Sequence, residues 1–332
     1  MKIFITGATG LIGANSTLEL LRAGYQVRLL VRNADNARAY FKAHGFDIDD
    51  IVVADMLDKA SVKAGMAGCD AVLHSAAIVD LDARNAERTR ETNLQSIESV
   101  IGSACELGIG KILYVSSMSV FYDFSQPVLT EDTPMADVHD AYSLSKKLCE
   151  TRIRELQHQG YPIISTYPSA VFGPDDPKLA ESNSAIIRFL TTVVPLTSSG
   201  MQFIDARDIA IAHRLLLEGE LDNDRTKERY ILGGTFVRWP ELADLLERAA
   251  GRKLWRLPVP GPLFRVVGVL FDLVRHLVPI EFPISREATR IVTQLPLAES
   301  SRLHARTGLE FRPPLDTLTD TIAWMRKAGK VK

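Results

Sequence analysis

Two side chains four residues apart, Tyr142 and Lys146, could together move a proton. On a helix, residues at i and i+4 share one face. An ammonium group beside a phenol favours the phenolate, so Tyr142 could act as a general acid or base near neutral pH. The spacing alone occurs often by chance, and its meaning depends on the chain around it.

A serine hydroxyl precedes this pair by one strand and one helix. Ser117 follows the apolar run 112–116, which we expect to be a strand. The carboxyl end of a parallel strand is the sheet edge where ligands bind. There Ser117 would hydrogen-bond the substrate oxygen that Tyr142 protonates or deprotonates. Ser119 is a further candidate for a substrate contact.

A glycine-rich loop near the N-terminus has the spacing of a dinucleotide-binding turn. The apolar run 3–6 leads into Gly7, Gly10 and Gly13, and a helical pattern follows. Gly7 allows the tight turn, Gly10 lets the backbone approach a pyrophosphate, and Gly13 lets the helix pack close to the sheet. Amides at the helix start would face the phosphates. The expected cofactor contacts of the loop are Gly7, Thr9, Gly10, Leu11, Ile12 and Gly13.

The end of the second predicted strand bears on which nicotinamide cofactor binds. NAD enzymes place an Asp or Glu there to hold the ribose 2′-hydroxyl. Here the strand 27–31 is followed by Arg32, and no acid stands at its end. A guanidinium suits a 2′-phosphate, so the sequence favours NADP(H) over NAD(H). A plain surface arginine is the alternative for Arg32, and Arg38 is either a second phosphate contact or solvated.

Asp55 and Met56 follow the third predicted strand, 51–54. The Asp55 carboxylate could accept a hydrogen bond from the adenine amino group. The alternative is an aspartate that caps a turn or a helix.

The elements that must position these side chains alternate along the first half of the chain. This alternation predicts an α/β Rossmann fold, a doubly wound parallel sheet covered on both faces. The predicted strands are 3–6, 27–31, 51–54, 71–74, 112–116 and 163–167, and the predicted helices are 11–23, 89–106 and 142–158.

We expect two units in the chain. Residues 1–168 form the NADP-binding Rossmann domain, and residues 204–229 return to it. Residues 169–203 and 230–332 form a smaller, partly discontinuous α/β substrate domain. Beyond residue 204 we expect helices over 205–218 and 239–250 and a strand over 230–232.

The composition is that of an ordinary globular protein. The chain has 332 residues, of which 46% are hydrophobic and 24% charged, and a net charge of −2, so nothing points to a nucleic acid partner. Cys69, Cys105 and Cys149 are widely spaced, which predicts neither a metal site nor disulfides. The apolar start is too short for a signal peptide, which predicts a cytoplasmic protein.

The segment 261–280 is apolar around most of a helical wheel. Its polar side chains gather on one narrow side with Gly268, and they argue against a transmembrane span. They are Arg265, Asp272, Arg275 and His276. Three interpretations stay open: a well-buried helix, a mobile apolar wall over the substrate, or a surface that rests on a membrane or a partner.

Several motifs together resemble those of the extended short-chain dehydrogenase/reductases, the NAD(P)-dependent epimerase/dehydratase family. They are TGATGLIG at 6–13, HSAA at 74–77, TN at 92–93, VSSMSVFY at 115–122, YSLSK at 142–146, YPSAVFGP at 167–174, FIDARDIA at 203–210 and YILGG at 230–234. The chain looks more like the dihydroflavonol reductase and 3-beta-hydroxysteroid dehydrogenase branch. The resemblance implies that Ser117, Tyr142 and Lys146 are the catalytic triad. It also implies cofactor contacts from Ala76, Ala77, Pro168 and Ser169.

Two departures argue against a sugar nucleotide as substrate. Sugar-nucleotide enzymes of this family usually carry an Arg-x-x-Asn run, and Tyr167 and Ala170 stand at those two places. With Arg32, this favours an NADP(H)-dependent carbonyl reductase or alcohol dehydrogenase acting on a fairly apolar small molecule. A nucleotide-sugar epimerase or dehydratase is the alternative, and a non-catalytic NADP(H) sensor is the third hypothesis.

The substrate pocket is expected from segments 80–85, 117–123 and 169–203 and from the region after 233. The resemblance also implies that helices over 92–107 and 142–158 could pair with those of a second copy in a homodimer.

Overall fold

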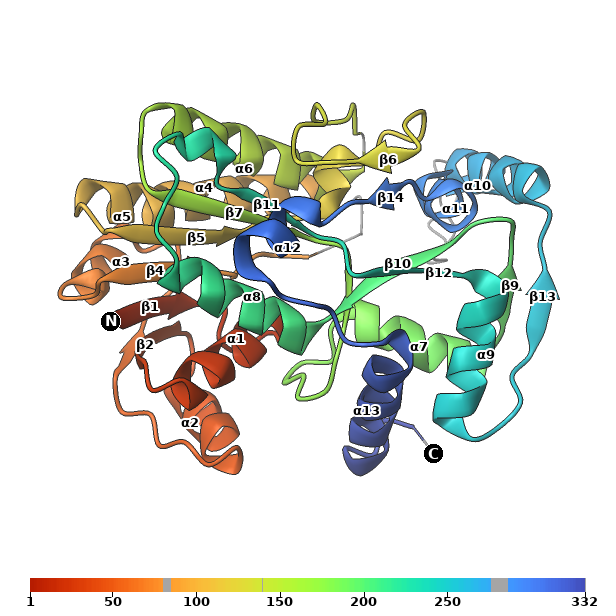
Figure 1. Cartoon of the computed structure of the whole chain (residues 1–332), viewed down its shortest axis with the longest axis horizontal. Coiled ribbons are helices and arrows are strands. Elements are labelled where there is room, and N and C mark those ends of the chain that lie inside the picture. Colours follow the sequence, from red (N-terminus) through yellow and green to blue (C-terminus); the bar gives the residue numbers. More distant parts are fainter. Residues whose placement is uncertain (80–84, 139, 276–285, 332) are drawn as a thin grey trace.

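A seven-stranded, fully parallel sheet forms the larger part of the computed structural model, which describes residues 1–79, 85–138, 140–275 and 286–331 (Figure 1). Its strands lie in the order β11-β7-β5-β4-β1-β2-β3. Most of their residues are buried, which explains why these segments are continuous apolar runs. The strands are β1 (Lys2–Thr6), β2 (Gln26–Val31), β3 (Ile51–Val53), β4 (Ala71–His74), β5 (Lys111–Val115), β7 (Ile163–Pro168) and β11 (Arg229–Leu232).

Helices cover both faces of this sheet, which confirms the doubly wound Rossmann fold (Figure 1). One face carries α1 (Leu11–Arg22), α2 (Ala34–Ala43) and α8 (Ala206–Glu218). The other face carries α3 (Lys59–Met66), α4 (Ala86–Ser96), α5 (Ser103–Glu106) and α6 (Ala141–His158). The helix predicted over 89–106 begins three residues earlier, and a π-helical segment, Ile97–Gly102, joins α4 to α5.

The smaller unit has two short sheets and its own core. β8 (Ala170–Phe172), β10 (Gly200–Asp205) and β12 (Thr235–Arg238) form one sheet, and β9 (Val194–Leu196) pairs with β13 (Arg256–Pro258). The helices here are α7 (Glu181–Thr191), α9 (Trp239–Ala250), α10 (Gly261–Arg275), α11 (Arg286–Gln294) and α13 (Pro314–Lys327). Phe172, Trp239 and Leu318 are among the buried side chains of its core.

Two segments assigned to the smaller unit by sequence lie against the large sheet. β11 pairs with β7, and Tyr230, Ile231 and Leu232 are buried there, so the expected boundary before residue 230 moves to the Gly233–Gly234 turn. α12 (Ser301–Thr307) packs against α8 and β11. β14 (Leu297–Ala298) pairs with β6 (Val128–Leu129) and so connects the C-terminal part to the loop after β5.

The predicted helix 261–280 appears as α10 over Gly261–Arg275, while residues 276–280 lie outside the described part of the chain. Leu263, Val266 and Leu270 are each more than half exposed, so the interpretation as a well-buried helix is wrong for this side of α10. Of the predicted pocket segment 80–85, residues 80–84 are also outside the described residues. Among the helices that the structure describes, none has the length and apolar character needed to cross a bilayer.

Candidate active site

The glycine loop joins β1 to α1 at the carboxyl end of a central strand. Gly7 has φ of 78°, and the Gly10 amide donates to the Gly7 carbonyl oxygen over 2.9 Å. A Cβ at Gly13 would lie 2.2 Å from that same oxygen, whereas a Cβ at Gly10 would lie 3.5 Å from it. α1 has no side-chain cap, so the amides at its start are available to an anion. The loop therefore fits a pyrophosphate.

Arg32 directly follows β2, and its side chain is exposed. It therefore lies at the strand end where the sequence predicted a contact with the 2′-phosphate. Arg38 lies on α2 and makes a loose ion pair with Asp35 at 3.6 Å. Both arginines lie in the part of the chain that directly follows β2. Because the Arg32 side chain is exposed, an anion can reach it.

Asp55 follows β3 and holds a turn. Its carboxylate accepts a hydrogen bond from the Leu57 amide over 2.9 Å, which is the turn-capping role that stood as the alternative in the sequence. The neighbouring Met56 offers its carbonyl oxygen to the Ser99 hydroxyl, which joins this turn to the π-helical segment. The adenine contact of Asp55 and Met56 stays a prediction.

Tyr142 and Lys146 lie one turn apart on α6. Asp140 fixes the start of this helix, because its carboxylate accepts from the Ser143 amide over 2.9 Å. Lys146 is buried, and its Nζ donates to the Val115 carbonyl oxygen over 3.1 Å. Tyr142 is half-buried one turn earlier. The lysine of the pair is thus held at the carboxyl end of β5, next to the predicted serine.

Ser117 caps a 3₁₀ helix, η3 (Met118–Phe121), which packs against α6. Its Oγ accepts from the Ser119 amide over 3.2 Å, which leaves the Ser117 hydroxyl proton to be donated to another oxygen. Ser119 Oγ is buried and has no hydrogen-bond partner among the described residues. Both hydroxyl groups therefore have hydrogen-bonding capacity that a substrate could use.

Three polar side chains that the sequence analysis did not select, Thr6, His74 and Ser96, are linked by short contacts, and His74 lies near Lys146. His74 Nδ1 is 2.6 Å from Thr6 Oγ1, and His74 Nε2 is 3.4 Å from Ser96 Oγ. Burial, with a contribution from the Lys146 charge, lowers the pKa of His74 to about 3, so its ring is neutral at neutral pH. The only signal in the sequence was the HSAA motif.

Asn93 on α4 links three parts of the site. Its side chain binds both backbone groups of Ile78, at 2.8 and 3.0 Å, and donates to Ser145 Oγ on α6 over 2.9 Å. The TN motif at 92–93 was the signal for this residue, but its spacing alone indicated no role for Asn93. The space enclosed between these elements is too small to hold a water molecule, and it is lined by His74, Ala76, Ala77, Asn93, Ser96, Ile97, Tyr114, Lys146 and Cys149.

Tyr122, at the end of η3, is a second tyrosine close to Tyr142. Burial and the neighbouring Tyr142 raise the pKa of Tyr122, so its phenol stays protonated. The Tyr122 ring lies 6.3 Å from the Phe124 ring, and the Arg290 guanidinium lies 4.4 Å from the centre of the Phe124 ring. Two aromatic rings, those of Tyr122 and Phe124, therefore follow one another from the neighbourhood of the predicted catalytic tyrosine.

Tyr167, which stands where sugar-nucleotide enzymes carry an arginine, is fully buried. Its hydroxyl donates to Glu150 Oε1 over 2.6 Å, so it offers no cation to a ligand. After Pro168 ends β7, the Ser169 hydroxyl donates to the Gly233 carbonyl oxygen over 2.7 Å. This bond joins the two chain segments that leave the large sheet for the smaller unit.

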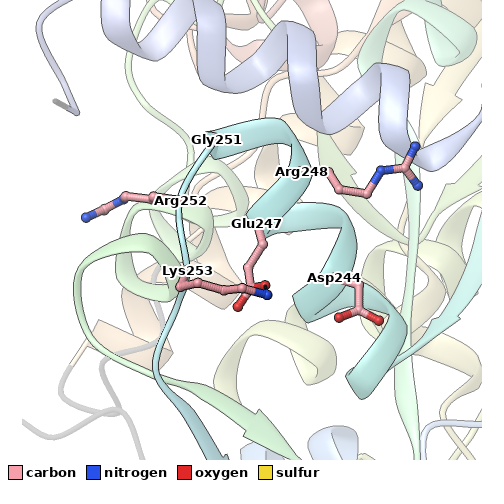
Figure 2. Close-up of a pocket in the computed structure, with 6 residues that line it drawn as sticks. All are labelled: Asp244, Glu247, Arg248, Gly251, Arg252 and Lys253. Atoms are coloured by element: carbon pink, nitrogen blue, oxygen red, sulfur yellow. Dashed lines mark hydrogen bonds and ion pairs between the residues drawn. The ribbon is translucent and has the colours of Figure 1, made fainter.

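A larger, open depression lies at the end of α9, in the smaller unit (Figure 2). Lys253 there forms an ion pair with Glu247 at 2.8 Å, and Arg256 pairs with Asp244 at 2.6 Å. None of the predicted catalytic residues lines it. Within the described ranges, no group of three or more His, Cys, Asp or Glu side chains could hold a metal ion, and all three cysteines are free thiols.

Known proteins are similar to this chain over most or all of its length. Residues 3–233 match the NAD dependent epimerase/dehydratase family. A putative dihydroflavonol 4-reductase of Synechocystis sp. is 28% identical over 99% of this chain and 96% of its own length. Sterol demethylase protein B of Methylococcus capsulatus is 23% identical over the full length of both. Cinnamoyl-CoA reductase 1 of Oryza sativa subsp. japonica is 28% identical over 74% of each chain.

Solved structures share the architecture. The structure of gox2253 superposes with a TM-score of 0.84 at 26% identity over 99% of both chains. A UDP-glucose-4-epimerase from Stenotrophomonas maltophila, solved with NAD and formylated UDP-arabinopyranose, has a TM-score of 0.77 at 18% identity over 99% of both chains. At that identity the second likeness supports the fold alone.

Proposed function

Because the chain belongs to the NAD dependent epimerase/dehydratase family and is an NAD(P)-dependent oxidoreductase of the extended short-chain dehydrogenase/reductase type, we propose that it is an NADP(H)-dependent carbonyl reductase or alcohol dehydrogenase. The substrate we propose is a fairly apolar small molecule. Relatives with reductase names, among them a putative dihydroflavonol 4-reductase and a cinnamoyl-CoA reductase, support the proposal that this chain is a reductase.

The position of Lys146 carries the proposal. Its ammonium group is held on the Val115 carbonyl oxygen, one helical turn from Tyr142, at the end of the strand that leads to Ser117. Tyr142 then passes its proton to the substrate oxygen in reduction, or takes it in oxidation, while Ser117 donates a hydrogen bond to the same oxygen. A bound nicotinamide cofactor would supply or accept the hydride.

We propose that the cofactor is held by the glycine loop and by Arg32. The residues of this chain that would contact it are Gly7, Thr9, Gly10, Leu11, Ile12, Gly13, Arg32, Asp55, Met56, Ala76, Ala77, Tyr142, Lys146, Pro168 and Ser169. The preference for NADP(H) depends on the exposed Arg32 at the end of β2 and on the absence of an acid at that end of the strand.

An apolar substrate is supported by the side chains around Tyr142. Tyr122 and Phe124 provide two aromatic rings, and Ser117 and Ser119 provide the polar groups that the sequence already selected. The buried Tyr167 supplies no positive charge for a nucleotide diphosphate. The sterol demethylase protein B name of one full-length relative points to the same class of substrate.

An assay that follows the consumption of NADPH directly tests the proposal. Purified protein with NADPH and a panel of apolar ketones and aldehydes should consume NADPH, and the Tyr142→Phe variant should not. A nucleotide-sugar epimerase or dehydratase, the second candidate because epimerases share the fold, would instead retain a cofactor that dilution cannot remove and would turn over UDP-sugars. Binding of NADPH without turnover of either class would favour the sensor.

The homodimer through α4 and α6 and the cytoplasmic location stay predictions. α4 and α6 lie side by side, and Arg152 of α6 pairs with Glu98 of the following π-helical segment at 2.6 Å. Light scattering of the purified protein would test the dimer.

A further inference from the structure

α10 packs with the side that carries Arg265 and Gly268 toward the protein and exposes apolar side chains on the opposite side. A surface helix normally buries its apolar stripe. On α10, Gly268 is buried, and the Arg265 guanidinium donates to Thr293 Oγ1 of α11 over 3.2 Å. Leu263, Val266 and Leu270, which share the other side of the helix, have exposed fractions of 62%, 55% and 54%.

The segment before α10 also exposes large apolar side chains. Trp255 is 82% exposed and Leu257 is 53% exposed, and Figure 1 places β13 and α10 at one end of the longest axis of the molecule. Of the thirteen large apolar side chains exposed in the described ranges, six lie within residues 255–270. We call these six the α10 face: Trp255, Leu257, Leu263, Val266, Val269 and Leu270. Such a concentration marks a contact surface.

Positive charge accompanies the α10 face. Residues 248–265 contain five arginines and lysines and no aspartate or glutamate, whereas the whole chain has a net charge of −2. With Asp244 and Glu247 counted, residues 244–265 still carry +3, five minus two. Figure 2 shows Lys253 turned toward Glu247, while Arg252 points away from Glu247 and donates to the Leu190 carbonyl oxygen over 2.6 Å.

We propose that the α10 face docks the protein on the surface of an anionic lipid bilayer. The apolar side chains would enter the boundary between head groups and acyl chains, with Trp255 at head-group depth. The exposed cations Arg248, Arg252 and Lys253 would contact lipid phosphates. The proposal does not depend on the proposed reaction.

The charge distribution favours lipid over a second copy of the chain. Two α10 faces in contact would bring two segments of charge +3 together, which opposes association. An anionic bilayer neutralises the same charges. The arrangement of one exposed tryptophan, exposed aliphatic side chains and flanking cations is also that of helices that lie at a membrane surface.

Tryptophan fluorescence gives a direct test. Trp239 is buried and Trp324 half-buried, so a blue shift on addition of vesicles would report mainly on the exposed Trp255. We would compare phosphatidylcholine vesicles with vesicles that contain about 30% phosphatidylglycerol, and confirm binding by flotation. Leu263→Glu should weaken binding to the anionic vesicles by about tenfold or more. The matched control is Leu107→Glu, an exposed leucine at the end of α5, which should bind as the wild type does.

Each outcome decides the proposal. Binding that requires anionic lipid, falls with salt and is lost in Leu263→Glu supports it, provided that this variant keeps the wild-type melting temperature and NADPH binding. No binding to either vesicle, or equal binding to both, overturns it. A dimer in light scattering that Leu263→Glu dissociates, without vesicle binding, also overturns it and assigns the α10 face to a second copy.

Discussion

The Lys146 ammonium donates to the Val115 carbonyl oxygen over 3.1 Å and so joins the helix that carries Tyr142 to the strand that leads into Ser117. The bond crosses from α6 to β5, two elements brought together by the winding of the parallel sheet. Since Lys146 is buried, its charge is poorly screened by water and acts strongly on neighbouring groups. This relationship turns three separate residues of the sequence into one candidate site.

Tyr142→Phe should lower kcat by about 10² to 10⁴ and leave NADPH binding within a factor of a few, because only the proton donor is removed. Steady-state assays with NADPH and fluorescence titration of the cofactor would separate the two effects. Tyr161→Phe, which changes a tyrosine beyond the far end of α6, serves as the control. Full activity in Tyr142→Phe would exclude the proposed proton transfer.

Arg32→Ala should weaken NADPH binding at least about tenfold, or about 1.4 kcal/mol, and leave NADH binding unchanged. The reason is that only NADPH carries the 2′-phosphate that the guanidinium would contact. Arg188→Ala, an exposed arginine on α7 paired with Glu181, controls for the general loss of a positive charge. Equal losses for both cofactors would contradict the NADP(H) preference.

Gly10→Ala and Gly13→Ala should fail in different ways. A Cβ at position 13 would lie 2.2 Å from the Gly7 carbonyl oxygen, a backbone atom, so Gly13→Ala should lower the melting temperature. A Cβ at position 10 would have its nearest neighbour at 3.5 Å, so Gly10→Ala should fold but lose NADPH affinity, because the methyl group occupies the approach to the phosphates. Thermal unfolding and cofactor titration of both variants would check this. Unchanged affinity in a folded Gly10→Ala would show that the pyrophosphate lies elsewhere.

The sequence predicted those parts of the fold whose signals are local. The strand that ends at Thr6, the glycine loop and α6 each carry their pattern within a few residues. The short sheets of the smaller unit could not be predicted, for two reasons. β10 and β12 pair although α8 and β11 lie between them in the sequence. In addition, strands of only a few residues carry little periodicity. The strand over 230–232 was predicted, but its pairing with β7 was not, because no local pattern shows which distant strand it joins.

The site residues that the sequence analysis did not select, Asn93 and Tyr122, could not be identified for a different reason. Asn93 and Tyr122 matter through what they lie beside, Ser145 and Tyr142, and no spacing along the chain shows this. The side of α10 that faces the protein could not be deduced either. The helical wheel showed where Gly268 lies, but only packing against α11 shows that this side is turned inward.

Two histidines that are buried in the described part of the chain should make the fold sensitive to mild acid. Burial lowers the pKa of both His213 and His74 from 6.5 to about 3. Each ring is neutral in the folded chain and takes up a proton in the unfolded chain below about pH 6.5, so the free energy of unfolding is full above that pH and falls as the pH drops toward 3. Each histidine contributes a slope of about 1.4 kcal/mol per pH unit within this window.

His213→Gln isolates one of these contributions. His213 lies between Ser16 Oγ at 2.9 Å and Thr166 Oγ1 at 3.2 Å, and glutamine cannot replace both contacts, so the variant should be less stable than the wild type by about 1–3 kcal/mol at pH 7.5. It should lose less stability than the wild type between pH 6.5 and 5, because one proton-binding group of the unfolded chain is gone. Urea unfolding at three pH values would measure both effects. His158→Gln, which removes an exposed histidine at the end of α6, should keep the wild-type slope. If His213→Gln had the same dependence of stability on pH as the wild type between pH 6.5 and 5, His213 would have to take up a proton in the folded chain over that range.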